Sequence, residues 1–184
     1  TLLNVFRSNP DFDAVFLLDR SGRCLAASDP QFMGQNYAFR DYFREAIGGR
    51  AYVSSILVGQ TTKRPGLFLS HPVRSQTGEI VGVTVLKMRG EDIWNIVNSL
   101  QVGSSSYAFL IDQHGVIVSH RDRSLLYHSL NRLPPQTQKQ IVTDRSYGLN
   151  QIKSLNIPDL KVMVRATEPG HTSYYFPLNQ MPRI

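Results

Sequence analysis

Residues 14–29 read AVFLLDRSGRCLAASD, and residues 107–122 read YAFLIDQHGVIVSHRD. Each stretch consists of an apolar run rich in strand formers, a turn with glycine, and a second strand-like run, so each is predicted to form a β-hairpin. Aligned without gaps, the two stretches share Phe16, Leu17, Asp19, Gly22 and Asp29, which match Phe109, Leu110, Asp112, Gly115 and Asp122.

The spacing of these hairpins indicates how the chain is divided. The second copy begins 93 residues after the first, which is close to half of the 184 residues. The shared residues fall at the strand, at the acidic residue before the turn and at the turn glycine, where geometry restricts the choice of residue. We therefore expect two related modules in tandem, each opening with the same hairpin.

The rest of the first half predicts a helix and an antiparallel meander. Apolar residues between 39 and 47 recur at helical spacing, and Gly48–Gly49 supplies a stop. Strand-like runs follow at residues 52–58, 66–73 and 79–88, then an amphipathic helix at 93–100 and a break at 103–106.

The second half indicates a similar α/β (α+β) organisation with an incomplete end. We expect a helix from Pro134–Pro135 to about residue 142, strands at 147–155 and 160–166, and a loop at 171–184. Because that loop does not complete a sheet, we expect the final strand of the second module to be missing.

Composition indicates a folded, basic chain. An apolar content of 41% in 184 residues is ample for a buried core. The net charge of +6 suits nucleic acid, anionic lipid or small anions as partners. However, residues 121–132, the stretch richest in Lys and Arg, also contain Asp122 and three leucines, which is atypical of nucleic-acid binders. We expect no nucleic-acid partner.

Motifs for catalysis and cofactor binding are missing from the sequence. It contains no Walker loop, HExxH, GxSxG or strand-to-helix GxGxxG motif. His114 and His120 have the spacing of one strand face, and we interpret them as a turn histidine and a surface histidine. Cys24, the single cysteine, cannot form an internal disulfide and is expected to be a small core residue. We predict that the chain is not an enzyme and holds neither metal nor cofactor.

The ends of the chain favour an excised domain over a complete soluble protein. There is no apolar run of about 18 residues, as a membrane span would need, and no signal peptide. Thr1 starts within an apparent helix, and Ile184 ends in mid-segment.

An unusual feature is the aromatic entry to the first helix, GQNYAFRDYF at residues 34–43. Aromatic walls around one guanidinium suit a small carboxylate, since the guanidinium donates two parallel hydrogen bonds and the rings exclude water. Alternatively, the aromatics fill the core and Arg40 pairs with Asp41 or other acidic neighbours of Arg44. Polar Lys87 and Ser70, within apolar strands, are either edge residues or pocket donors.

Three stretches resemble the membrane-distal module of double-Cache (dCache, PAS-like) sensor domains. They read FLLDRSGRCLAAS at 16–28, FMGQNYAFRDYFREAIGGR at 32–50 and GLFLSHPVRSQTGEIVGVTVLKM at 66–88. The stretches are similar to the periplasmic regions of sensor histidine kinases of the four-carbon dicarboxylate transport type. The resemblance is specific over residues 14–90 and weaker over 107–176.

This resemblance implies two PAS-like sheets stacked along a long N-terminal helix, in the periplasmic part of an inner-membrane protein. Residues 1–13 would end that stalk helix, 14–100 would form the membrane-distal module and 101–184 the membrane-proximal one. Flanking transmembrane helices would lie outside this chain.

The resemblance also implies a ligand site in the distal module. Arg40, Tyr42 and Phe43 fall on the R-x-aromatic-aromatic signature of the family, whose arginine and ring hydroxyl hold a ligand carboxylate. Where amino-acid-binding relatives carry an aspartate, this sequence has Lys87, which suits a second carboxylate and favours dicarboxylates. The weaker candidates for neutral donors are Ser70, Thr61 and Thr62.

We therefore expect a periplasmic sensor domain, from a histidine kinase, in which a small organic anion shifts the equilibrium between two arrangements of the modules. A homodimer is a further expectation. One alternative is a ligand-free Cache pair that serves as a dimerisation or protein-docking domain. Another is the sensor domain of a chemoreceptor or diguanylate cyclase.

Overall fold

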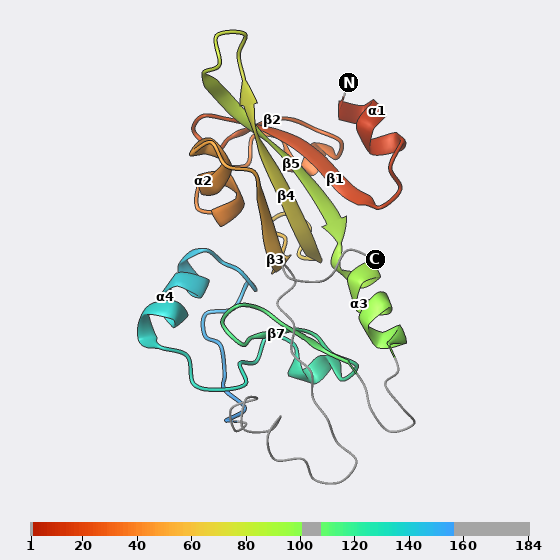
Figure 1. Ribbon diagram of the computed structural model, residues 1–184, viewed down its shortest axis with the longest axis vertical. Coiled ribbons are helices and arrows are strands. Elements are labelled where there is room, and N and C mark those ends of the chain that lie inside the picture. The colour runs from red at the N-terminus through yellow and green to blue at the C-terminus, as the bar shows by residue number, and fades with distance from the viewer. Residues whose placement is uncertain (1, 101–107, 157–184) are drawn as a thin grey trace. The chain divides into compact units, whose positions relative to one another are not determined.

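A computed structural model describes residues 2–100 and 108–156 (Figure 1). The chain is divided into two compact units. Unit 1 consists of residues 1–93 and 139–150, and unit 2 of residues 94–138 and the chain from residue 151. The chain thus returns to unit 1 after entering unit 2. The tandem modules expected at 14–100 and 101–184 stay a prediction.

Unit 1 is built on a five-stranded antiparallel sheet in the order β2-β1-β5-β4-β3. This arrangement confirms the antiparallel α/β fold class, with its first hairpin and meander. The strands are β1 (Phe12–Asp19), β2 (Cys24–Ala27), β3 (Tyr52–Val58), β4 (Pro65–Arg74) and β5 (Ile80–Arg89). A 3-10 turn, η1 (Pro30–Phe32), and the predicted helix, α2 (Asp41–Ile47), connect β2 to β3.

One face of this sheet carries the core of unit 1. Because strand side chains alternate between faces, every second residue of β1, β4 and β5 points to the same side. Phe16 stacks on Phe32 and Tyr42 on Phe68, with ring centroids 4.9 Å and 5.0 Å apart. Cys24 is buried in this core, as predicted, and burial raises the pKa of its thiol.

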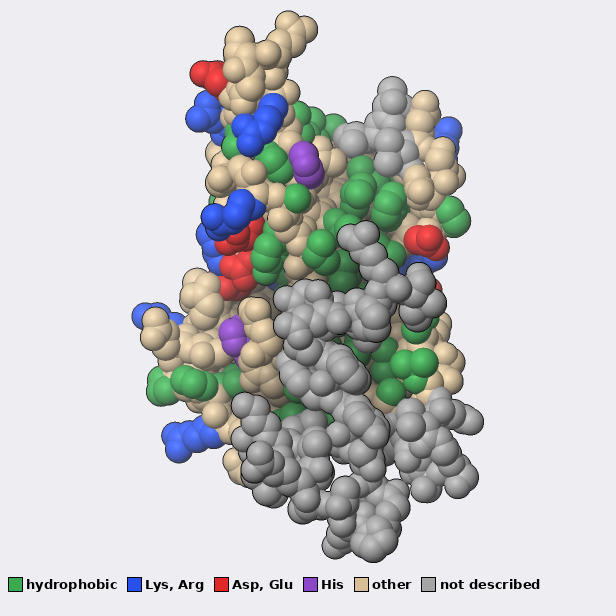
Figure 2. Space-filling view, viewed as in Figure 1, with side chains coloured by type: hydrophobic (Ala, Val, Ile, Leu, Met, Phe, Trp, Pro, Cys, Tyr) green, Lys and Arg blue, Asp and Glu red, His purple; other side chains and the backbone are tan. Residues whose placement is uncertain are grey.

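The other face of the sheet is partly open to solvent. Figure 2 shows hydrophobic side chains at the surface over unit 1. The short helix α1 (Leu2–Arg7) contacts β1 and β2, and the long stalk helix implied by the resemblance stays a prediction. The half-exposed apolar residues of this face are Leu17, Leu67, Leu69, Leu86 and Met88.

Unit 2 contains a two-stranded sheet of β6 (Leu110–Ile111) and β7 (Ile117–Ser119), followed by a 3-10 turn, η2 (Arg123–Leu125). The predicted helices α3 (Gly90–Ser99) and α4 (Pro135–Thr143) are the segments in which the chain passes from one unit to the other.

The two predicted hairpins have the same turn. In each, one oxygen of the aspartate, Asp19 or Asp112, accepts hydrogen bonds of 2.8–3.0 Å from the backbone N–H groups two and four residues later. Gly22 and Gly115 have positive φ angles of 83° and 76°, which glycine adopts without strain. The aligned residues therefore mark a common local structure.

The prediction of a strand at residues 147–155 is wrong. This stretch is irregular, with one bridge between Ser154 and Ser129. Gly148, at a φ of 69°, interrupts any extended run. The expectations for residues 103–106, 160–166 and 171–184 fall outside the described residues.

Within the described residues, no helix has both the length and the apolar character needed to cross a membrane.

Candidate ligand-binding site

Arg40 is a buried arginine at the start of α2. Its backbone N–H donates to the carbonyl of Tyr37, and only 1% of the residue's surface is exposed to solvent. Nη1 donates to the carbonyl oxygens of Asp144 and Arg145, at 3.1 and 3.2 Å, and Nη2 to that of Val58, at 2.8 Å. Burial lowers the pKa of Arg40, but a guanidinium remains charged at neutral pH.

The Arg40 guanidinium still has donors to spare. It carries five N–H groups, and its three carbonyl acceptors use three of them. Nε is buried and has no hydrogen-bond partner among the described residues. Nε–H and the second N–H of Nη2 remain, and one side of a guanidinium presents these two nitrogens to a carboxylate.

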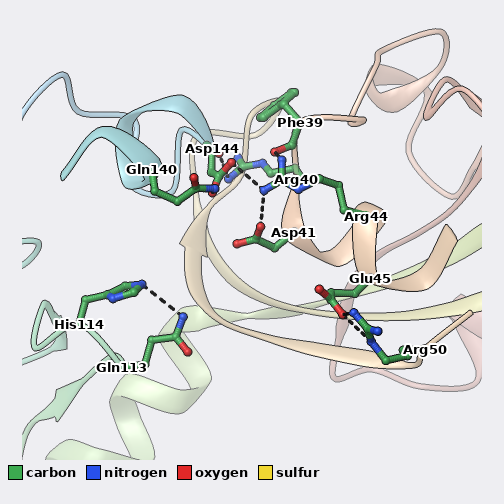
Figure 3. A network of polar contacts seen from close by, with 10 residues as sticks. All are labelled: Phe39, Arg40, Asp41, Arg44, Glu45, Arg50, Gln113, His114, Gln140 and Asp144. Atoms are coloured by element: carbon green, nitrogen blue, oxygen red, sulfur yellow. Dashed lines mark hydrogen bonds and ion pairs between the residues drawn. The ribbon is translucent and has the colours of Figure 1, made fainter. Parts of the chain in front are cut away.

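Arg44, not Arg40, pairs with the nearby carboxylates. Its Nη2 forms ion pairs with Asp41 and, at 2.8 Å, with Asp144. Gln140 donates to the other oxygen of Asp144 at 2.6 Å. Figure 3 shows Arg44 pointing toward both aspartates. Arg44 therefore forms the ion pairs that the alternative prediction assigned to Arg40, and Arg40 donates to backbone carbonyls instead.

Lys87 is fully buried near the end of β5, on the same sheet face as Val83 and Val85. Its ammonium forms an ion pair with Asp13 and donates to Oγ1 of Thr62 at 3.0 Å. An ammonium has three N–H groups, so one has no acceptor within residues 2–100 and 108–156. Lys87 is thus an interior cation and not a solvated strand end.

Asp13 reaches Lys87 because of an irregularity in β1. The register between β1 and β5 shifts between Phe12 and Ala14, as in a β-bulge with Asp13 as the extra residue. In a regular strand, Asp13 and its neighbour Ala14 would point to opposite faces. Ala14 pairs with Lys87 on the core side, and the bulge directs Asp13 to that side as well.

Glycine leaves room for the Lys87 stem. A Cβ atom added to Gly66, on β4, would lie 2.6 Å from Cε of Lys87, and one on Gly59 would lie 3.6 Å from it. The Val58 carbonyl, which accepts from Arg40, directly precedes Gly59. The two buried cations therefore both adjoin the β3–β4 loop, residues 59–64.

The two threonines of this loop contact different parts of the site. Oγ1 of Thr61 hydrogen-bonds the hydroxyl of Tyr37 at 2.6 Å, and Thr62 accepts from Lys87. Burial raises the pKa of the Tyr37 hydroxyl, which favours its neutral form. Ser70 donates to the carbonyl of Tyr42 at 2.7 Å.

The predicted site residues thus fall into two groups. Thr61 and Thr62 belong to the β3–β4 loop, and Arg40 and Lys87 adjoin it. Tyr42 and Phe43 lie in the aromatic core, and Ser70 donates a hydrogen bond to the backbone carbonyl of Tyr42. Sequence reasoning missed Asp13 and Tyr37. Tyr37 lies within the aromatic stretch already singled out, but no pattern indicated the bulge at Asp13.

A family model described as a Cache domain matches residues 1–179. The chain belongs to the Cache domain family. Among curated proteins, this Cache chain is similar to the C4-dicarboxylate transport sensor protein DctB of Rhizobium meliloti, with 31% identity over 123 residues, 63% of this chain and 18% of that protein. It is also similar to the methyl-accepting chemotaxis protein McpG of Pseudomonas putida, with 29% identity over 98 residues, 53% of this chain and 15% of that protein.

Two solved Cache structures share the fold. The sensor domain of the V. cholerae histidine kinase DctB has a TM-score of 0.70 and 31% identity, covering 84% of this chain and 58% of that one. The ligand-binding domain of the Pseudomonas aeruginosa PAO1 amino acid chemoreceptor PctC, in complex with GABA, has a TM-score of 0.56 and 30% identity, covering 69% of this chain and 57% of that one.

These similarities confirm the predicted family and the prediction that the domain is non-catalytic, because the matched Cache regions are ligand-binding sensor domains. The chain spans less than a quarter of the curated sensor proteins that it matches.

Proposed function

We propose that this Cache chain is the periplasmic ligand-sensing domain of a bacterial inner-membrane receptor, from a sensor histidine kinase, and that unit 1 binds a small organic anion. A dicarboxylate or a similar carboxylic acid is the proposed ligand class. The similarity to two DctB proteins supports the histidine kinase, and the two buried cations support an anionic ligand.

The observation that carries this proposal is the Arg40 guanidinium. A buried N–H without a partner is costly, by about 1–3 kcal/mol for a neutral group and more for a charged one. A carboxylate bound across Nε and Nη2 would satisfy it with two charge-assisted hydrogen bonds. The carbonyl partners of Nη1 would stay in place and hold the guanidinium in position.

Lys87 would hold the far end of the ligand through its remaining N–H. The loop threonines, with Tyr42, Phe43 and Ser70, would complete the site or support its walls. Two charge-assisted contacts at roughly 1.5–3 kcal/mol each supply about 3–6 kcal/mol before ordering costs, and on their own correspond to roughly millimolar binding at best.

A chemoreceptor sensor domain is the second candidate. The similarity to McpG and to the PctC ligand-binding domain supports it, because both are chemotaxis receptors. The ligand site proposed here would be the same for either output.

Isothermal titration calorimetry with succinate, acetate and alanine tests the ligand class. We expect succinate to bind most tightly and Arg40→Lys, which keeps the charge but loses the bidentate donor, to weaken binding at least tenfold. Arg44→Lys is the matched control, since Arg44 faces Asp41 and Asp144, and should bind succinate nearly as the wild type does. Equal binding to wild type and Arg40→Lys would contradict the site. The absence of binding by all three compounds would favour a docking domain.

A further inference from the structure

Asp13 brings a negative charge into the proposed site. Its side chain is 17% exposed and forms an ion pair with Lys87, whose side chain is 0% exposed. Besides Asp13, the described residues offer the Lys87 ammonium only the neutral hydroxyl of Thr62. A buried ammonium without its counter-ion is costly, which keeps Asp13 in place.

The charges of Arg40, Lys87 and Asp13 therefore sum to one positive charge. Arg40 contributes one and Lys87 another, and Asp13 cancels one of the two. Nearby, Arg44 pairs with both Asp41 and Asp144, and Arg145 lies over the ring of Phe39, so these two cations and two carboxylates sum to zero. Lys63 and Arg64, in the β3–β4 loop, are exposed, so solvent screens their charges.

We propose that Asp13 is a specificity-determining residue, which selects ligands with a single net negative charge. This inference rests on the proposed function, in which Arg40 and Lys87 hold the two ends of the ligand. A carboxylate at Arg40 neutralises the site, and a second full negative charge beside Asp13 would be repelled in a poorly solvated interior.

The chemistry of the far group follows from the Lys87–Asp13 pair, which offers one N–H donor and a carboxylate acceptor side by side. A group that both accepts and donates hydrogen bonds satisfies both residues. A carboxamide, a hydroxyl or a protonated carboxyl group does so, whereas a carboxylate can only accept. The preferred ligand class is thus a short carboxylic acid with a neutral polar far end, including the singly protonated form of a dicarboxylate.

Calorimetry with succinate and its monoamide, succinamate, tests this at neutral pH. The two have similar size and shape. At neutral pH succinate carries two negative charges and succinamate one, because carboxyl groups have pKa values of about 4. We expect the wild type to bind succinamate roughly tenfold more tightly or better, and Asp13→Asn to prefer succinate. Asp11→Asn removes an exposed charge two residues away and should keep the wild-type preference.

A second variant guards against poor folding of Asp13→Asn. The double variant Asp13→Asn/Lys87→Gln replaces the ion pair by two neutral amides and leaves the net charge unchanged, so it should still prefer succinamate. Wild-type preference for succinate, unchanged by Asp13→Asn, would overturn the role of Asp13 and leave the proposed function standing. Failure of every variant and the wild type to bind either compound would overturn both.

Discussion

Gly34 and Tyr127, 93 positions apart, occupy the same place in two copies of one chain path. The N–H of Gly34 donates to the carbonyl of Cys24 at 3.0 Å, and that of Tyr127 to the carbonyl of Ile117 at 2.8 Å. Both have positive φ angles, 72° and 62°. The repeat in structure therefore extends beyond residue 122, where the aligned sequence ends, and one copy holds a bulky residue in a conformation that favours glycine.

The backbone at Gly34 should carry a measurable cost of substitution. A Cβ atom there meets nothing closer than 3.8 Å, so Gly34→Ala should destabilise the fold through its φ angle alone, by roughly 1–2 kcal/mol. Gly34→Asn should cost less, because asparagine adopts this conformation more readily. Urea unfolding measures both, and equal stability of all three proteins would contradict the assigned conformation.

Two arginine–carboxylate pairs in unit 1 should differ in their contribution to stability. Asp144 is 5% exposed and accepts from Arg44 and Gln140, so Asp144→Asn should lower the free energy of unfolding by roughly 1.5–3 kcal/mol. The control is Glu45→Gln, which breaks the exposed pair with Arg50 and should cost less than about 1 kcal/mol. Similar losses in chemical denaturation would show that burial of Asp144 is not what matters.

Tyr42 should make the fold sensitive to alkali. Burial raises the pKa of its hydroxyl above the ordinary value of 10.0. The unfolded chain then loses this proton before the folded one, so the stabilisation is complete below pH 10 and is lost as the pH rises beyond it, by at most about 1.4 kcal/mol per pH unit. The melting temperature of the wild type should fall relative to that of Tyr42→Phe as pH rises above 10, and parallel curves would refute this.

Ligand binding at Arg40 should protect residues 139–150 from hydrogen exchange. The same guanidinium holds the carbonyls of Asp144 and Arg145, and a ligand that orders it reduces the cost of ordering this segment. We expect slower exchange of amides in 139–150 with succinate or succinamate bound, and no such change in Arg40→Lys. Faster exchange in the bound wild type would show that the ligand displaces the segment.

Local patterns determined much of the fold. Alternation and turn glycines located both hairpins and the meander. Helical spacing located α2 and α3, and the Pro134–Pro135 start located α4. The prediction for residues 147–155 failed because this stretch forms its hydrogen bonds with residues far away in the sequence. Leu155, for example, donates its N–H to the carbonyl of Ser129.

The site was predictable in its cations but not in their partners. Arg40 and Lys87 stood out as charges within apolar or aromatic runs. The partner of Lys87 lies 74 positions earlier in the chain and depends on a bulge, and the partners of Arg40 are backbone carbonyls, which every residue has. Neither leaves a signature in residue identity.

The return of residues 139–150 to unit 1 limits how this protein can be dissected. A gene fragment ending at residue 100 would encode all five strands of the larger sheet, yet it would omit both carbonyl acceptors of Arg40 Nη1. Its sensing behaviour would then differ from that of the intact domain for reasons unrelated to signalling. Receptor chimaeras that exchange this domain should be joined outside it, with residues 1–150 kept uncut.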